Sequence, residues 1–237
     1  MSKNTNILKN NKVLLGISTK KDGNLRLLGK DTVIKNNRQC FLKKNALKKE
    51  NLVSSKLIHG NKIKIISDKD ENKNLKGYDG LITNIPKIIL SITVADCLPI
   101  YFYDSNKNVI GLAHAGWRGL KSSIIKKMIK SFKSEYQSDT KNIKIFIGPH
   151  IQKCHFEIRN DLLKKFKEYD SFIIKKKDKI FLDLELIAKQ QLLENKILKK
   201  NIEISPECTY CLKNKYFSYR RDGDKNFQTM MAYIELK

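Results

Sequence analysis

Three apolar segments in close succession constrain the fold of this chain more than any other feature of its sequence. Residues 87–94, 99–103 and 109–113 have the length and the β-branched content of strands, and only short polar stretches separate them. An amphipathic helix is then predicted to begin just after Gly119, because apolar residues recur at helical spacing: Leu120, Ile124, Ile125, Met128, Ile129 and Phe132. Strands that follow one another directly, and also alternate with helices, favour mixed sheets with helices packed outside them over a doubly wound parallel sheet.

The remainder of the chain adds weaker signals of the same kind. Further strands are predicted at residues 143–147, 202–204 and 230–234, and helices at residues 161–169 and from the N-cap Asp183 to about residue 198. The polar residues 67–76 predict a long surface loop. The chain has 237 residues and shows neither a repeat nor a linker. We therefore expect a single domain over residues 1–237, with the polar first dozen residues as a candidate flexible segment.

Charge and cysteine content narrow the class of protein. Lys and Arg number 48 against 24 acidic residues, which gives a net charge of +24. The lysines are scattered along the chain and arginines are few, so we expect a solvated lysine coat and no specific nucleic-acid partner. No apolar run approaches the ~20 residues that span a bilayer, so no membrane association is expected. No export signal is visible and the five cysteines are an odd number, which predicts reduced thiols and a cytoplasmic location.

Four polar residues embedded in apolar, strand-like sequence are candidates for chemistry, because burying them without partners is costly. Asp96 and Cys97 lie between two predicted strands, His114 ends the third, and His59 follows an apolar pair. One Cys and two His are the ligand types of a catalytic Zn²⁺ site. Linear spacing leaves open whether they meet, and the alternative is histidines that serve only as hydrogen-bonded parts of the core.

A second candidate site lies where the third strand turns into the predicted helix. Residues 111–119 read GLAHAGWRG, so small residues surround the turn and Arg118 lies within it. Backbone N–H groups at a helix start together with a guanidinium suit a phosphate or a carboxylate. The alternative is a tight strand–helix connection in which Trp117 packs into the core.

Four sequence blocks, in this order, resemble the signature blocks of the YfiH family, whose members are called laccase-domain proteins, multicopper polyphenol oxidases or purine nucleoside phosphorylases. The resemblance extends from about residue 33 to the C-terminus. The blocks are TVADCLPI (93–100), GLAHAGWRGL (111–120), IGPHIQKCHFEI (147–158) and FSYRRDG (217–223).

This resemblance implies an α+β domain with mixed sheets sandwiched between helices, an αββα arrangement. It implies a Zn²⁺ site formed by His59, Cys97 and His114, with Cu²⁺ as a substitute because copper binds such donors more tightly. The implied activities are phosphorolysis of adenosine, inosine, guanosine and S-methyl-5′-thioadenosine, and deamination of adenosine. The implied partners are therefore purine nucleosides and phosphate, and the protein is expected to be a monomer or a homodimer.

Individual residues are predicted to take part in catalysis and binding. Cys97, His114 and Asp96 are predicted to be catalytic; the general acid is left unassigned, with Asp96 and Glu157 as its two candidates. The residues predicted to bind substrate or phosphate are Asn37, Arg38, Gly116, Trp117 and Arg118.

The sequence departs from the family pattern at three places. Ile58 replaces the usual Gln, His155 replaces the second of two cysteines, and the Gly-Arg that normally follows the RRDG block is missing, where the uncharged Gln228 is no equal substitute. Cys208 and Cys211 form a CxxC pair after which no further ligands follow, so we expect a loop with buried thiols. His150 and His155 flank Cys154, and they are expected to line the pocket around the first site; the alternative is a second metal site at these residues.

Two other classes of function stay open. A conventional laccase is excluded, because it needs many imidazoles and this chain has four histidines and no HxH pair. A cysteine hydrolase or amidase, with Cys97 as nucleophile and His114 as its base, remains an alternative and would act on a peptidoglycan precursor. A nucleic-acid-associated protein is favoured by net charge alone.

Overall fold

The strands form two large sheets and one small sheet in the computed structural model, which describes residues 12–27 and 31–237. The five-stranded sheet has the order β1 (Val13–Ile17), β14 (Met230–Leu236), β6 (Ile89–Val94), β2 (Leu52–Lys56) and β4 (Asn74–Lys76). The six-stranded sheet has the order β13 (Ile202–Ile204), β9 (Ile143–Ile147), β7 (Leu98–Asp104), β8 (Val109–Ala115), β5 (Gly80–Thr83) and β3 (Ile63–Ile65). The small sheet consists of β10 (Glu157–Ile158), β12 (Lys179–Leu182) and β11 (Ile173–Lys176).

Both large sheets contain parallel and antiparallel pairs, as the sequence predicts. β2 runs parallel to β4 and β6, whereas β14 runs antiparallel to β1 and β6. In the six-stranded sheet β7 and β8 form an antiparallel pair, and the edge strands β3 and β13 pair in parallel with their neighbours. Mixed pairing follows from the order of elements, because adjacent strands joined by short turns pair antiparallel and distant strands are free to pair in parallel.

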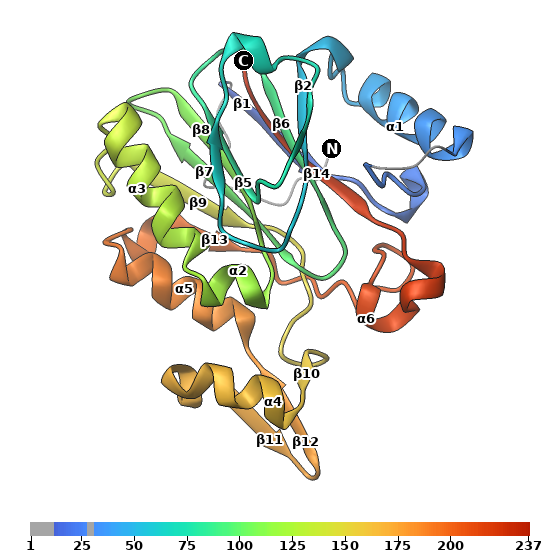
Figure 1. Ribbon diagram of the computed structural model, residues 1–237, viewed down its shortest axis with the longest axis vertical. Helices are drawn as coiled ribbons and strands as arrows, with labels where there is room; N and C mark the ends of the chain where they lie inside the picture. Colours follow the sequence, from blue (N-terminus) through green and yellow to red (C-terminus); the bar gives the residue numbers. More distant parts are fainter. Residues whose placement is uncertain (1–11, 28–30) are drawn as a thin grey trace.

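Side-chain alternation along the strands sorts the core into layers. In β7 the side chains of Ile100 and Phe102 pack toward the helices, and Tyr101 and Tyr103 pack between the two large sheets. The helices α3 (Ile124–Tyr136) and α5 (Leu184–Glu194) cover the outer face of the six-stranded sheet. The helix α1 (Thr32–Lys44) covers the five-stranded sheet on the opposite side (Figure 1). The result is the predicted αββα sandwich.

Three connections carry the chain from the five-stranded sheet to the six-stranded sheet, and each contains residues of the candidate site. Residues 57–62 join β2 to β3 and include His59. Residues 77–79 join β4 to β5 and end with Asp79, and residues 95–97 join β6 to β7 and include Asp96 and Cys97. The site is therefore built where the chain changes sheets, beside the end of β8 that carries His114.

The predicted strands are confirmed, and the predicted helices need corrections. The helix expected after Gly119 is two helices, α2 (Trp117–Lys121) and α3, because Ser123 has a left-handed φ of 62° and Ser122 Oγ donates to the Arg118 carbonyl. Serine hydroxyls compete with helical backbone bonds in this way. The helix expected at 161–169 is α-helical only in α4 (Asn160–Leu163), after which a 3₁₀ segment continues over Lys164–Phe172.

Two further boundaries differ from the sequence prediction. Helix α5 begins as predicted at the cap, where Asp183 accepts a hydrogen bond from the Leu186 amide, but it ends at Glu194. Residues 67–76 are not simply a loop, since they contain a 3₁₀ turn at Asp68–Asp70 and the edge strand β4. The first eleven residues, which are most of the predicted flexible segment, lie outside the described residues. Within the described part of the chain, no helix is long and apolar enough to cross a bilayer.

Candidate metal centre

The structure brings the three predicted metal ligands together. The donor atoms of His59, Cys97 and His114 all lie within 4.8 Å of one another. The two imidazole rings are nearly perpendicular, with centroids 4.8 Å apart and an interplanar angle of 88°. His114 is buried, Cys97 is half-buried and His59 is exposed. Three soft protein ligands that face solvent on one side have the arrangement of a catalytic zinc site, in which a fourth position stays free.

Asp79 holds two of these ligands in place, and the sequence analysis assigned it no role. Its carboxylate is completely buried. One oxygen, Oδ1, accepts from the His59 amide at 2.9 Å and faces His114 Nδ1 at 3.1 Å. The other oxygen, Oδ2, accepts from the Gly60 amide at 2.8 Å. A carboxylate at Nδ1 fixes the ring orientation and leaves Nε2 of His114 for the cluster, as is usual for metal-ligating histidines.

The backbone at this site adopts uncommon conformations. His59 has φ of 58° and Asp96 has φ of 83°, a region that side chains other than glycine rarely occupy. Gly116 lies against the cluster, and a Cβ built on it would lie 2.8 Å from Cys97 Sγ. Strain and close approach of this kind persist where the surrounding structure requires them, and they often mark functional sites.

Cys97 and His114 also form a charge pair. Burial alone would raise the pKa of Cys97, but the charge and hydrogen bonds of the two histidines lower it to about 6. Burial would lower the pKa of His114, yet the Cys97 thiolate and Asp79 raise it to about 9. A thiolate is the form of cysteine that binds metals and acts as a nucleophile.

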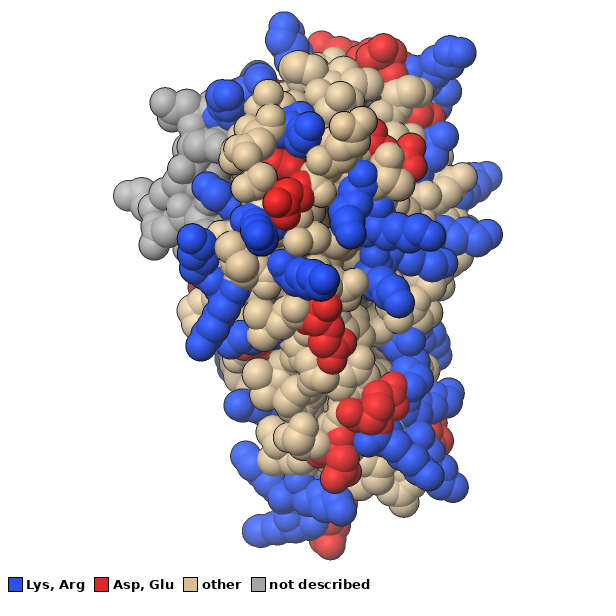
Figure 2. All heavy atoms as spheres, turned by 90° about the vertical axis from the view of Figure 1, so that its left-hand side faces the viewer, with Lys and Arg blue, Asp and Glu red and all other residues tan. Residues whose placement is uncertain are grey.

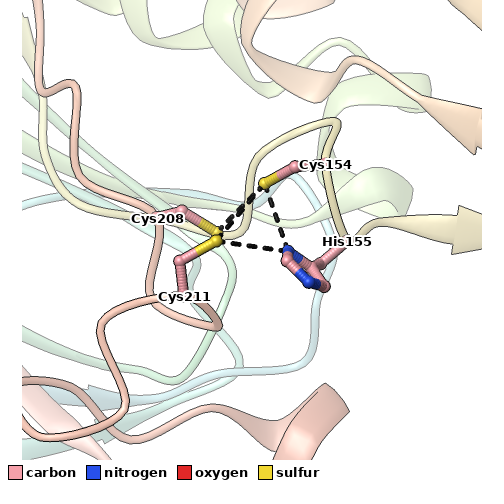
Figure 3. Close-up of side chains that lie close together, drawn as sticks. All are labelled: Cys154, His155, Cys208 and Cys211. Carbon is pink, nitrogen blue, oxygen red and sulfur yellow. Dashed lines mark hydrogen bonds between the residues drawn. The ribbon is translucent and has the colours of Figure 1, made fainter.

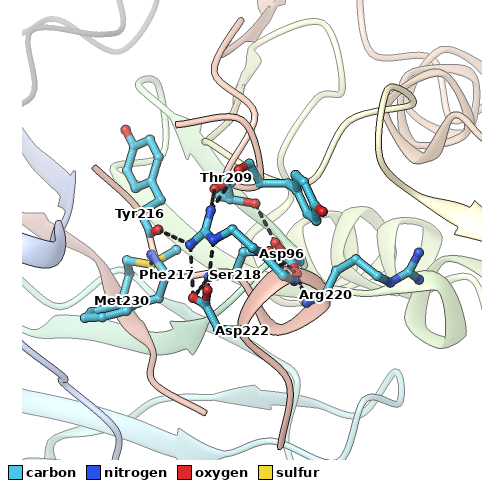
Figure 4. Close-up of polar contacts among 10 residues, drawn as sticks. Asp96, Thr209, Tyr216, Phe217, Ser218, Arg220, Asp222 and Met230 are labelled. Carbon is cyan, nitrogen blue, oxygen red and sulfur yellow. Dashed lines mark hydrogen bonds and ion pairs between the residues drawn. The ribbon is translucent and has the colours of Figure 1, made fainter. Parts of the chain in front are cut away.

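Asp96 points away from the cluster and supports the turn that carries Cys97. Its carboxylate accepts hydrogen bonds from Thr209 Oγ1 at 2.6 Å, Ser218 Oγ at 3.0 Å and the Arg220 amide at 2.7 Å (Figure 4). Burial raises the pKa of Asp96, although these bonds oppose the shift. Its predicted catalytic role stays a prediction, and these contacts tie the Cys97 turn to residues 209–220.

The neighbouring Arg221 connects different parts of this segment, residues 209–220, with one another. Its guanidinium donates to the carbonyl oxygens of Thr209, Tyr210 and Tyr216 at 2.8 to 3.0 Å. The RRDG block is thereby part of the scaffold beneath Asp96. It includes the short helix α6 (Tyr219–Asp222), which the Ser218 hydroxyl caps.

The residues predicted to bind substrate or phosphate fall into two groups. Asn37 and Arg38 lie on α1, where their side chains donate to the carbonyls of Asn24 at 3.3 Å and Leu25 at 2.8 Å. Burial lowers the pKa of Arg38 to about 10. Gly116, Trp117 and Arg118 follow β8 directly, and Gly116 lies against the cluster.

Trp117 is half-buried and Arg118 is exposed. The Arg118 guanidinium stacks on the Trp117 ring at 4.2 Å, and the edge of Phe166 packs against the same ring at 6.4 Å. Trp117 is thus part of the packing, as the alternative interpretation of this segment proposed, and Arg118 is the exposed cation of this turn.

The remaining histidines do not line the first site, which corrects the sequence prediction. His150 is buried, and its Nδ1 lies 2.9 Å from the Gly148 carbonyl. His155 instead joins Cys154, Cys208 and Cys211 in a second cluster. Cys211 and Cys154 are exposed, so only Cys208 of the CxxC pair has the buried thiol that the sequence predicted. Glu157 is exposed and forms an ion pair with Lys179 at 3.1 Å.

Basic side chains are spread over the molecular surface. Figure 2 shows Lys and Arg from top to bottom of one face, with acidic residues between them. A groove beside α3 and α5 is lined by several lysines but contains none of the predicted site residues. The even spread agrees with a lysine coat.

The fold and the His₂Cys cluster define a class of αββα proteins with a candidate metal site at the crossings between two sheets. The family described as multi-copper polyphenol oxidoreductase laccase matches residues 18–237, and the chain belongs to this family.

Named relatives and solved structures agree with this assignment. The chain is 39% identical over 175 residues to a Clostridium acetobutylicum protein named purine nucleoside phosphorylase, a match that covers 72% of each chain. It is 26% identical to purine nucleoside phosphorylase YlmD of Bacillus subtilis, over 96% of this chain and 90% of that protein. The crystal structure of Bacillus licheniformis YfiH superposes with a TM-score of 0.89 at 29% identity, covering 95% of this chain and 93% of that one.

The oxidase wording of the family description does not fit these residues. A multicopper oxidase combines a blue-copper centre with a trinuclear cluster, which requires many imidazoles. The chain has four histidines, of which His59 and His114 share one cluster while His150 and His155 lie elsewhere. His59 and His114 together with Cys97 can build one N/S site for a single metal ion, not a multicopper centre.

Proposed function

We propose that this protein is a zinc-dependent purine nucleoside enzyme. Its reactions would be phosphorolysis of adenosine, inosine, guanosine and S-methyl-5′-thioadenosine, and hydrolytic deamination of adenosine. The observation that carries the proposal is the convergence of His59, Cys97 and His114 on one partly open point, with Asp79 behind them. The names of the relatives, which are purine nucleoside phosphorylases, support the substrate class.

The donor set fits Zn²⁺, because two imidazoles and one thiolate are ligands that zinc prefers and their donor atoms are close enough to share one ion. Cu²⁺ is a substitute that the same donors would accept. A metal bound there would supply a Lewis acid, which lowers the pKa of bound water to about 7 and makes it a nucleophile at neutral pH. In deamination, a water oxygen forms a bond to C6 of adenosine as ammonia leaves.

The protein residues prepare this site for both reactions. Asp79 keeps the Nδ1 proton of His114 and thereby directs Nε2 toward the cluster. In phosphorolysis, an oxygen of phosphate forms a bond to C1′ of the ribose while the bond from C1′ to the purine breaks and the base takes up a proton. Arg118 is the favoured phosphate ligand because it is exposed beside Gly116, whereas Arg38 is engaged with Leu25 and Ser54.

The test is a product analysis on adenosine with and without phosphate. Adenosine alone should give inosine, and adenosine with phosphate should also give adenine and ribose 1-phosphate. Arg118→Ala should raise the KM for phosphate without changing inosine formation. If adenine forms equally fast in the absence of phosphate, the enzyme is a nucleoside hydrolase and the phosphorolysis proposal fails.

A cysteine hydrolase is the second candidate, and one observation favours it. Cys97 Sγ and a ring nitrogen of His114 lie within 4.8 Å of each other, and a pKa lowered to about 6 at Cys97 and raised to about 9 at His114 agrees with a thiolate–imidazolium pair. Such a pair is the activated nucleophile of cysteine hydrolases. In this reaction the Cys97 thiolate would attack an amide carbonyl of a peptidoglycan precursor, and His114 would protonate the leaving amine.

His59 distinguishes the two candidates, because a Cys97–His114 pair does not require a third imidazole. If the site binds zinc, His59→Ala should lower zinc occupancy and activity as much as Cys97→Ser, and iodoacetamide should label Cys97 only after chelation. Cys40→Ser is the matched control, because this cysteine is exposed on α1. Full activity of His59→Ala, together with a covalent substrate adduct on Cys97 in metal-free protein, would establish the hydrolase instead.

A further inference from the structure

Three thiols and one imidazole meet at a second point of the molecule, away from the residues used above. Cys154 Sγ lies 3.6 Å from both Cys208 Sγ and Cys211 Sγ. His155 Nδ1 lies 3.2 Å from Cys154 Sγ and 3.3 Å from Cys211 Sγ. Figure 3 shows the four side chains pointing toward one another from two separate loops. All four donor atoms lie within 4.8 Å of one another.

These separations are close to those that a tetrahedral zinc ion imposes on its ligands. A Zn–S bond of about 2.3 Å places two tetrahedral sulfur ligands about 3.8 Å apart, and Zn–N bonds of about 2.0 Å place nitrogen and sulfur about 3.5 Å apart. The sulfur–sulfur distances of 3.6 Å are slightly below the first value. They are far above the ~2.05 Å of a disulfide bond.

We propose that Cys154, His155, Cys208 and Cys211 form a second, structural Zn²⁺ site. Four protein ligands fill a tetrahedral coordination sphere, so this site would be closed, unlike the three-ligand site at His59, Cys97 and His114. The three thiols bind as thiolates and release their protons as the metal binds. The Cys₃His donor set is one of the usual sets of structural zinc sites.

The surroundings of the cluster support metal binding. The His155 ring stacks on Tyr210 with centroids 4.0 Å apart and an interplanar angle of 15°, so its orientation is fixed. Arg220 Nη1 lies 3.4 Å from the His155 carbonyl, which brings a cation next to a site whose net charge would be −1.

The site would join two loops that are far apart in the sequence. Cys154 and His155 lie between β9 and β10, whereas Cys208 and Cys211 lie between β13 and α6. Backbone pairing already aligns these loops, because the Thr209 amide donates to the His150 carbonyl at 3.0 Å. A metal would fix this alignment, as structural zinc does where little apolar core holds a loop.

Thr209 connects the second site to the first. Thr209 lies between the ligands Cys208 and Cys211, and its hydroxyl donates to Asp96 at 2.6 Å. Asp96 directly precedes Cys97 and supports its turn. Zinc at the Cys₃His site would therefore hold the residues that position Cys97, and Thr209 would be a positioning residue rather than a catalytic one.

Alkylation of the purified, zinc-loaded full chain tests the proposal directly. Cys154, Cys211 and Cys40 are all exposed, so each is accessible to iodoacetamide when its thiol is free. Zinc coordination should protect Cys154 and Cys211 while Cys40 is modified as an internal control. A chelator should make all three reactive. Equal labelling of the three cysteines in zinc-loaded protein would overturn the proposal, and so would a disulfide among Cys154, Cys208 and Cys211.

Metal content provides the second measurement, which does not depend on the first site. Cys208→Ser and Cys211→Ser should each contain one zinc equivalent less than wild type, whereas Cys40→Ser should not. His155→Cys should keep the metal because it restores a fourth ligand, and His155→Ala should lose it. In a His59→Ala background one equivalent should remain, and the additional Cys211→Ser change should remove it. Zinc content unaffected by Cys211→Ser in that background would contradict the proposal.

Discussion

Asp79→Asn changes one atom of a completely buried side chain and tests how the first metal site is held. The carboxylate accepts from the amides of His59 and Gly60 at 2.9 and 2.8 Å and faces His114 Nδ1 at 3.1 Å. An asparagine has one acceptor oxygen, so in either orientation its amide group faces at least one N–H donor. We therefore expect the loss of at least one charge-assisted hydrogen bond, worth about 1.5–3 kcal/mol.

That loss should be seen mainly in metal affinity. A free energy of this size corresponds to about 10- to 100-fold weaker zinc binding, which is also the usual effect of removing a partner of a metal-ligating histidine. Competition of the purified protein with a chromophoric chelator measures the dissociation constant. The thermal unfolding midpoint of the metal-free protein separates the effect on the site from the effect on the fold.

Asp104→Asn is a matched control for this experiment. Asp104 is also a completely buried aspartate. It lies at the end of β7 farthest along the chain from Cys97, where its Oδ1 accepts a hydrogen bond from the Asn106 amide at 2.9 Å. Its replacement should leave zinc affinity at the wild-type value. The reasoning is refuted if Asp79→Asn binds zinc as tightly as wild type, or if both variants lose affinity equally.

Three other predictions follow from features of the same structure. Gly116→Ala should reduce zinc occupancy, measured by metal analysis, because its Cβ would lie 2.8 Å from Cys97 Sγ; wild-type occupancy would contradict the packing argument. Arg221→Ala removes three bonds to backbone carbonyls and should lower stability by about 2–4 kcal/mol, whereas the exposed Arg159→Ala should not; equal unfolding midpoints would refute this. DNA binding, measured by fluorescence anisotropy, should be weak and fall by about 10³–10⁵ between 50 and 200 mM salt; binding that survives would argue against a plain lysine coat.

The central strands could be predicted from the sequence because they are buried on both faces. Their side chains contact helices on one side and the second sheet on the other, so β6, β7 and β8 are almost continuously apolar. The edge strand β4 gave no such signal, since it pairs with β2 mainly through its backbone and is largely exposed. The interruption between α2 and α3 could not be predicted from the sequence either, because it depends on the local conformation of Ser123.

Some residues of the candidate site could be predicted from the sequence in the same way, and others could not. His59, Cys97 and His114 were found because each is a polar residue beside apolar strands. Asp79 was assigned no role, because its importance comes from contacts with residues 20 and 35 positions away.

The sequence offered a second metal site around Cys154 as an alternative, but it did not identify the Cys₃His ligand set. The ligands that complete the CxxC pair precede it in the chain, and Cys154 is 54 residues from Cys208. Only the parallel alignment of β9 and β13 brings the two loops together.

The three crossings between the large sheets have a consequence for how the molecule opens. His59, Asp79 and Cys97 each lie on a segment that leaves one sheet and enters the other, so sliding one sheet against the other would change the distances among them. Metal binding at this point should therefore slow amide hydrogen exchange in β2 and β6 together with β7 and β8. The two sheets would then open as one cooperative unit rather than as separate layers.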